Sequence, residues 1–147
     1  MSRISRLTNA VPMLVLHSPA HRVMSGRYAV IEFAGRRSGR TYRTPIAYVQ
    51  DGSRVLLSTD STWWRNLIDR PGVRLRLRGR EVVGQARLVG DEAEAAEVLR
   101  QLVERVPGYS RPAGVRMSGG RVSAAELARA VTSGGRRSIE VRLEGPR

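Results

Sequence analysis

The stretch "VRLRLRGREVVGQARLV", residues 73–89, decides the fold class, because its residues alternate in character on the way into a turn. Val73, Leu75 and Leu77 are separated by arginines, a period of two that predicts a strand with one buried side and one solvent-facing side. Gly79-Arg80 then reverses the chain into residues 81–89, which are again rich in strand-forming residues. This stretch therefore predicts an antiparallel hairpin with one arginine-lined face.

Further segments rich in strand formers lie on both sides of this hairpin. They are "YAVIEFA" (28–34), "TYRTPIAYVQ" (41–50), "RVLLSTD" (54–60) and "RRSIEVRLE" (136–144), the last with Ile139, Val141 and Leu143 expected to face inward. Pro45 suits an edge strand or a bulge, and Asp51-Gly52 predicts a tight hairpin turn.

Helix signals are fewer and shorter. A short helix is expected over residues 9–24, and another in "STWWRNLIDRP", where Ser61 or Thr62 begins it and Pro71 ends it. Asp91 with Glu94, and Ser123 with Glu126, form two capping-box patterns, each ahead of a helix. Residues 107–121 are expected to form a loop.

Together these segments predict an α+β fold: a mostly antiparallel split β-barrel of about six strands with short flanking helices. The 147 residues suit a single domain, 1–147, in which residues 1–27 form an N-terminal helical segment. The formal net charge of +13 predicts attraction to anions, such as nucleic acid, an anionic membrane surface or a polyanionic cofactor. The chain has no cysteine, which excludes disulfides and thiolate metal sites.

The amino-terminal apolar run, residues 11–16, is too short to cross a bilayer and shorter than a typical signal-peptide core. We therefore expect a cytoplasmic protein, for which a peripheral membrane contact at this end stays open.

The stretch "GRRSGRTYRTP", residues 35–45, contains four arginines and no acidic residue. Glycine allows the tight conformations that aim successive backbone N–H groups at one anion, and arginine adds a fork that matches phosphate. Ser38 and Thr41 add hydroxyl donors. From the residues alone, an anion-binding loop and a solvated surface loop are equally good interpretations.

The adjacent Trp63 and Trp64 point in different directions on a helix, so one can join the core while the other lines a pocket. Asn66 can bond backbone groups or the edge of a ligand ring. No catalytic residue can be assigned. His17 and His21 lie one helical turn apart without an acidic third ligand, so no metal site is expected. This combination is typical of a redox enzyme whose cofactor performs the chemistry.

Three stretches in order, "GRRSGRTYRTPIAYVQDG", "LLSTDSTWWRNLIDRPGVRLRLRGR" and "VPGYSR", resemble the deazaflavin (F420)-dependent nitroreductase family. The resemblance covers most of residues 28–109. It implies a split β-barrel of the FMN-binding type, related in fold to the pyridoxamine-phosphate oxidases.

The resemblance also implies coenzyme F420, a deazaflavin with a phosphate and a glutamate tail, as the cofactor. The phosphate and tail would lie on the arginine-rich stretch, and the ring system beside the tryptophans. Tyr109 matches a tyrosine near the substrate. The cofactor-binding positions implied are Arg36, Arg37, Ser38, Gly39, Arg43, Thr44, Pro45, Ser58, Thr59, Trp63, Trp64 and Asn66.

The expected function is hydride transfer from reduced F420 to a small-molecule acceptor: a quinone, a nitroaromatic or an enone-like compound. Two alternatives stay open. One is an FMN-binding oxidoreductase of the same fold. The other, less favoured, is a nucleic-acid-binding module that uses the arginines of residues 74–78. Monomer and homodimer are both compatible with the sequence.

Overall fold

The computed structural model describes residues 28–145, so the predicted helix 9–24, its histidines and the predicted membrane contact lie outside the described residues. The strands are β1 (Tyr28–Ala34), β2 (Thr41–Ala47), β3 (Val49–Asp51), β4 (Arg54–Thr59), β5 (Gly72–Leu77), β6 (Arg80–Leu88), β7 (Met117–Ser118), β8 (Arg121–Val122) and β9 (Arg137–Leu143). The helices are the 3-10 turn η1 (Trp63–Arg65), α3 (Asn66–Asp69), α4 (Glu92–Arg105), α5 (Ser110–Ala113) and α6 (Ala124–Val131).

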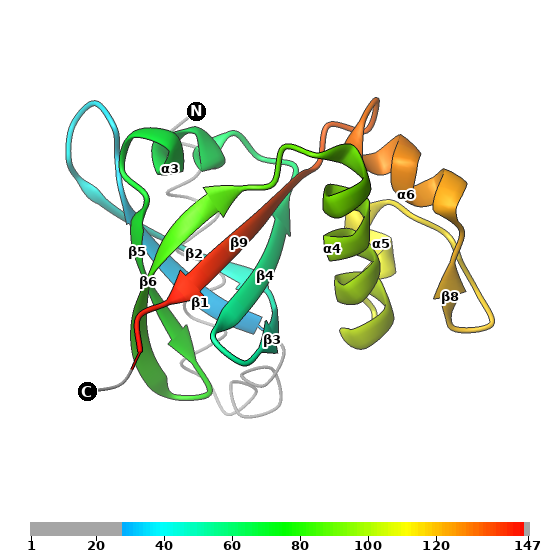
Figure 1. Ribbon diagram of the computed structural model, residues 1–147, viewed down its shortest axis with the longest axis horizontal. Helices are drawn as coiled ribbons and strands as arrows, with labels where there is room; N and C mark the ends of the chain where they lie inside the picture. Colours follow the sequence, from blue (N-terminus) through cyan, green and yellow to red (C-terminus); the bar gives the residue numbers. More distant parts are fainter. Residues whose placement is uncertain (1–27, 146–147) are drawn as a thin grey trace.

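Seven strands form one antiparallel sheet in the order β2-β1-β5-β6-β9-β4-β3. The two ends of this order, β2 and β3, are separated in the chain by Tyr48 alone. One bent segment therefore pairs with β1 in its first half and with β4 in its second, which curls the sheet back on itself (Figure 1). The predicted α+β split barrel is confirmed, and the expected strand 41–50 supplies both of its edges.

The hairpin of residues 73–89 forms, but its turn lies one residue earlier than predicted. Leu77 pairs with Arg80, so Arg78 and Gly79 occupy the turn, with φ of 51° and 78°. Two successive positive φ values define the type I′ turn that matches the twist of a hairpin. The turn after β3 is shifted the other way, to Gly52-Ser53, because Asp51 still pairs with Arg54.

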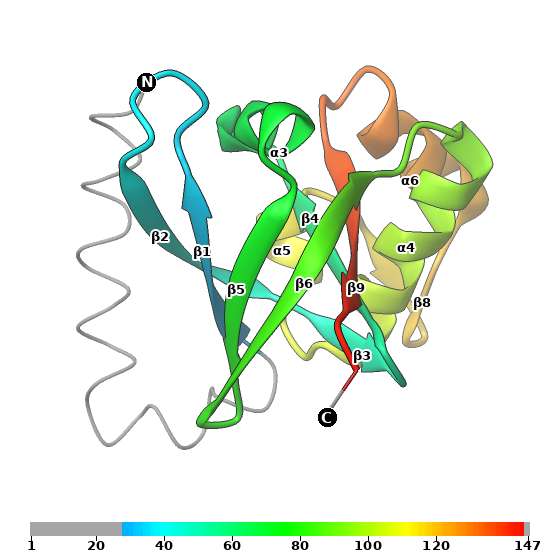
Figure 2. The same ribbon diagram turned by 60° about the vertical axis from the view of Figure 1, so that its left-hand side comes forward.

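The core lies in two places. Inside the barrel, Ile31, Leu57, Leu75 and Ile139 are fully buried, and for Leu75 and Ile139 this confirms the inward positions predicted from alternation. A second apolar cluster lies around α4, which packs against the β4–β9 side of the sheet, while α6 packs on α4 (Figures 1 and 2). Leu143, expected to face inward, is only partly buried because it lies at the end of β9.

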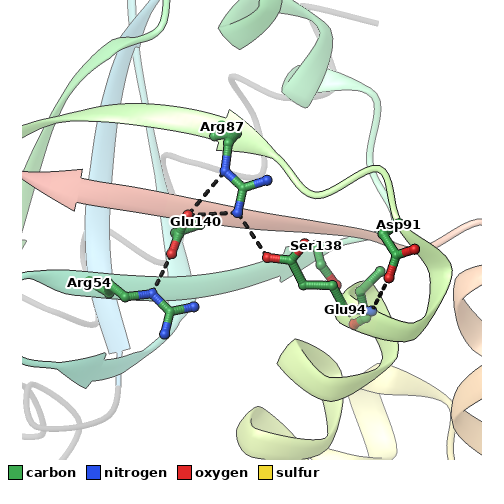
Figure 3. A network of polar contacts seen from close by, with 7 residues as sticks. Arg54, Arg87, Asp91, Glu94, Ser138 and Glu140 are labelled. Atoms are coloured by element: carbon green, nitrogen blue, oxygen red, sulfur yellow. Dashed lines mark hydrogen bonds and ion pairs between the residues drawn. The ribbon is translucent and has the colours of Figure 1, made fainter.

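Strand β9 is buried on both sides, which alternation alone did not predict. Glu140 is 4% exposed and accepts hydrogen bonds from Arg54 and Arg87 (Figure 3). Arg87 Nη2 also donates to Glu94 Oε2 at 2.8 Å, which links the sheet to the first turn of α4. Burial alone would raise the pKa of Glu140, but the hydrogen bonds from the two arginines hold it below its usual value.

The two helix starts predicted from capping-box patterns, at Asp91 and Ser123, are confirmed. Asp91 accepts a hydrogen bond from the Glu94 N–H at 2.9 Å, and Ser123 accepts one from the Glu126 N–H at 3.1 Å. The segment 107–121 was expected to be a loop, but it contains regular secondary structure: α5 and most of the β7–β8 hairpin. These elements are only four and two residues long, so they carry no periodic pattern that a sequence could show.

Candidate functional site

The loop between β1 and β2, residues 35–40, is folded back on itself by its own backbone. The Gly35 N–H donates to the Arg40 carbonyl and the Gly39 N–H to the Gly35 carbonyl, both at 2.8 Å. Ser38 Oγ accepts from the Arg40 N–H at 3.1 Å. Gly39 has a φ of 72°, a conformation that other residues rarely adopt. The glycines and the serine of this stretch therefore shape the loop.

Asn66, the first residue of α3, connects this loop to the segment that contains η1 and α3. Its Oδ1 accepts from the Arg36 N–H at 2.9 Å, while its Nδ2 donates to the Trp63 carbonyl at 2.9 Å. Both partners are backbone groups. Of the two roles that the sequence left open for Asn66, backbone bonding or contact with a ligand ring, the structure shows the first. Figure 2 shows the β1–β2 loop and α3 at the same end of the barrel.

A cavity of about 500 Å³ lies between this loop and η1. Three arginines from the two segments line it: Arg36, Arg37 and Arg65. Ser38, Thr62 and Asn66 add polar groups, and Phe33, Tyr42 and Trp63 supply aromatic surface. A concave site that is lined by three arginines and, among residues 28–145, by no carboxylate favours an anionic ligand.

The other predicted residues of the stretch lie elsewhere. Arg43 projects from β2 toward Glu32 and pairs with it at 2.9 Å, so its charge is engaged by a carboxylate. Arg40 and Gly39 do not line this cavity. The stretch 35–45 thus has two arginines that line the cavity, Arg36 and Arg37, and two that lie away from it, Arg40 and Arg43.

The two tryptophans diverge, as expected for neighbours in a helical turn. Trp63 is buried and stacks on Phe33, with ring centroids 5.0 Å apart, and Phe33 in turn stacks on Tyr42 at 5.8 Å. Trp64 is half-buried, with the guanidinium of Arg65 5.6 Å and that of Arg137 5.0 Å from its ring centroid. Trp63 thus joins the core and also lines the cavity, whereas Trp64 does not line it, so one residue takes both roles that were expected of two different tryptophans.

A second cavity, of about 420 Å³, shares Phe33 and Trp63 with the first. It brings together the remaining predicted residues: Thr44 and Pro45 from β2, Ser58 and Thr59 from β4, and Tyr109. The aromatic pair is thus a common wall between an arginine-lined cavity and one rich in hydroxyl groups.

Arg136, just before β9, also lines the second cavity and was missed from the sequence. It is 7% exposed, and its guanidinium donates to Ser58 Oγ at 3.0 Å and to the Tyr109 hydroxyl at 2.8 Å. One arginine among so many carries no distinguishing signal in a sequence. Only the fold brings it beside Tyr109.

Tyr109 is held by the same contacts. Its hydroxyl donates to the Ser58 carbonyl at 3.3 Å while it accepts from Arg136. Burial raises the pKa of Tyr109, and the nearby positive charge of Arg136 only partly offsets this rise. Tyr109 therefore remains a neutral hydroxyl at physiological pH.

Among residues 28–145, no group of three or more histidine, cysteine, aspartate or glutamate side chains is placed to hold a metal ion. Within that same range no helix is both long enough and apolar enough to span a bilayer.

Solved structures with this architecture include an F420 reductase, with 18% sequence identity, 86% of this chain and 93% of that chain covered, and a TM-score of 0.55. An F420-H2 dependent reductase, FDR-A, matches at 15% identity over 78% of this chain and 93% of its own, also at 0.55. A Listeria innocua protein provisionally named a pyridoxamine 5′-phosphate oxidase matches at 12% identity, with 92% and 93% covered, at 0.56. These likenesses show the shared split-barrel fold.

No curated protein matches the chain in sequence. The model of one protein family does match it, over residues 8–118, which include the β1–β2 loop, both tryptophans and Tyr109. The chain therefore belongs to the F420H(2)-dependent quinone reductase family of oxidoreductases.

Proposed function

We propose that this F420-dependent reductase transfers a hydride from reduced coenzyme F420 to a quinone, with nitroaromatic and enone-like compounds as further acceptors. The family supports the cofactor and the class of reaction. The shape of the site supports this class of acceptor. The second cavity is large enough for a small bicyclic ring, and hydroxyl groups, the arginine Arg136 and the exposed carboxylate Asp60 line it.

The residues present suit the cofactor's two chemically different ends. Its phosphate and glutamate tail is polyanionic and matches the cavity lined by Arg36, Arg37 and Arg65. Its flat ring system matches the aromatic wall formed by Phe33 and Trp63. Because that wall belongs to both cavities, a ring placed along it would lie next to an acceptor in the second cavity.

The bound deazaflavin supplies the hydride, and the chain's own residues position and enclose the reactants. The arginines of the first cavity would hold the anionic tail and so help to position the ring. Buried aromatic side chains exclude water from one side of the ring. No side chain of this site needs to act as an acid or base for the hydride itself to move.

The single observation that carries this proposal is the aromatic wall shared between an arginine-lined cavity and a hydroxyl-lined one. Purified protein mixed with reduced F420 and menadione tests it, with oxidation of the cofactor followed by absorbance. We expect oxidation that depends on both protein and menadione. Tight F420 binding without turnover of any quinone would overturn the acceptor assignment.

The nucleic-acid alternative is not adopted, because the arginine face of the β5–β6 hairpin carries its own counter-charges. Arg74 lies 3.6 Å from a Glu32 carboxylate oxygen and 4.0 Å from one of Glu81. A face interspersed with carboxylates attracts a phosphate backbone less strongly than a continuous basic stripe.

A further inference from the structure

A buried arginine without a buried counter-charge is costly, and Arg136 is such a residue. The only carboxylate paired with it in the described structure is that of Asp60, whose Oδ2 lies 3.9 Å from Nη1 and whose side chain is 70% exposed. That distance is too long for a hydrogen bond, and an exposed partner contributes little. The positive charge of Arg136 therefore remains largely uncompensated inside the second cavity.

The hydrogen-bond inventory of Arg136 is also incomplete. A guanidinium has five N–H groups. Within residues 28–145 three are used: Nε toward Ser58 Oγ, Nη1 toward the Pro112 carbonyl at 3.3 Å, and Nη2 toward the Tyr109 hydroxyl. One N–H on each terminal nitrogen is left over, in a residue that lines the cavity.

The three protein acceptors fix the orientation of the guanidinium. Ser58 and Tyr109 are themselves buried, and Tyr109 also donates to the Ser58 carbonyl. The group is therefore positioned before any ligand arrives, a condition under which charge stabilisation in a low-dielectric site is most effective.

We propose that Arg136, positioned by Ser58 and Tyr109, is the oxyanion-binding residue of the acceptor site: it binds the acceptor oxygen that gains negative charge during reduction. This inference rests on the proposed function and adds a specificity rule. Acceptors that leave the charge on an oxygen are favoured over those that do not.

The reaction balances without any further reactant. Hydride transfer breaks a C–H bond of the reduced deazaflavin and forms an O–H bond at one quinone oxygen. The two electrons reduce the quinone, so that the negative charge of the hydroquinone monoanion lies on the other oxygen. The proton released when the deazaflavin is oxidised, or one from water, then completes the hydroquinone. The Arg136 guanidinium binds the anion more strongly than the neutral carbonyl, which lowers the barrier.

The test uses binding to the protein without cofactor, so that it does not depend on turnover. The probes are 2-hydroxy-1,4-naphthoquinone, whose oxygen is anionic at neutral pH, and the neutral 2-methoxy-1,4-naphthoquinone, each titrated by calorimetry. We expect Arg136→Met to weaken binding of the anion about tenfold or more and binding of the neutral compound by less than about twofold. The matched control is Arg142→Met, an exposed arginine of β9.

Because a variant of a buried arginine can fail to fold, Asp60→Asn is the second arm. Asp60 lines the same cavity and is exposed, so its replacement leaves the fold intact while it removes the competing carboxylate. We expect it to tighten anion binding about two- to fivefold, the range of an exposed ion pair, because a negative charge at the cavity is removed, and to leave the neutral compound unchanged.

Equal losses for both probes in Arg136→Met, or no gain for the anion in Asp60→Asn, would overturn the proposal. So would an Arg136→Met variant that loses F420 affinity while its anion binding is unchanged, because Arg136 would then serve the cofactor. A wild-type protein that binds the anionic probe through Arg136 but does not bind F420 would refute the proposed function and leave the oxyanion site standing.

Discussion

The Oδ1 atom of Asn66 lies 2.9 Å from the backbone nitrogen of Arg36, thirty positions earlier in the chain, and its Nδ2 lies 2.9 Å from the Trp63 carbonyl. The side chain of Asn66 thus holds the β1–β2 loop against η1, which contains Trp63. Any ligand that contacts both sides of the first cavity depends on this connection.

Replacing Asn66 by alanine removes both hydrogen bonds. We expect a loss of about 1–2 kcal/mol in the free energy of unfolding, together with weaker F420 binding, since the loop is no longer held in place. Urea unfolding and a fluorescence titration measure the two effects. In the free energy of unfolding, Asn66→Asp should fall between wild type and alanine, because it keeps the oxygen acceptor for Arg36 but loses the donor to Trp63. The comparison uses unfolding alone, because the new carboxylate would itself repel an anionic ligand from the cavity. A full loss in Asn66→Asp would show that the Arg36 contact is not the important one.

The arginines of the β1–β2 loop should contribute unequally. Arg37 lines the first cavity, whereas Arg40 does not. We expect Arg37→Ala to weaken F420 binding at least about tenfold, the value of one charge-assisted contact to phosphate. Arg40→Ala should cost much less, and its effect should fade as salt is raised. Equal effects of the two substitutions would mean that the loop acts only as a diffuse positive surface.

The sequence predicted the barrel because strand alternation depends on local pattern, and most of its strands show that pattern clearly. Trp63, Tyr109 and the loop arginines could also be singled out, by rarity or by resemblance. Arg136 could not, because its role arises from burial beside Ser58 and Tyr109, which lie 78 and 27 positions away. The burial of Glu140 could not be predicted for the same reason. Alternation along β9 predicts that its side chain faces solvent, and its burial depends on hydrogen bonds from Arg54 and Arg87, which come from other strands.

Glu140 makes the stability of the fold depend on pH. Its pKa is lowered in the folded protein by Arg87 and Arg54, despite the opposing effect of burial. The unfolded chain therefore takes up the proton first as pH falls, from about pH 4.3 downward, and the contribution of Glu140 to stability is full above that value and lost below it.

We expect Glu140→Gln to destabilise the protein by about 1–2 kcal/mol at pH 7, a modest value because both arginine partners are partly exposed. The difference from wild type should shrink as pH falls from 5 toward the folded-state pKa. Urea unfolding at a series of pH values measures it. A constant difference down to pH 3 would contradict the assigned cause.

Gly84 of β6 marks the closest approach of that strand to β9. A Cβ atom at this position would lie 2.6 Å from the Arg142 carbonyl oxygen, a backbone atom that cannot swing away. We expect Gly84→Ala to lower the free energy of unfolding by about 1–3 kcal/mol. Gly72→Ala is the control, since a Cβ there would meet only the Gln85 side chain at 3.7 Å. Similar melting temperatures for the two variants would show that the strands separate easily at this point.

The central claim is that the arginine-lined cavity and the aromatic wall of Phe33 and Trp63 form a site for coenzyme F420, next to the cavity proposed for the acceptor. The most direct measurement is a parallel titration of the purified protein with F420 and with FMN, followed by tryptophan fluorescence, because Trp63 forms the shared wall. We expect saturable quenching by F420 that is at least about tenfold tighter than that by FMN and is weakened by Arg37→Ala. Tighter binding of FMN, or F420 binding unaffected by Arg37→Ala, would contradict the account.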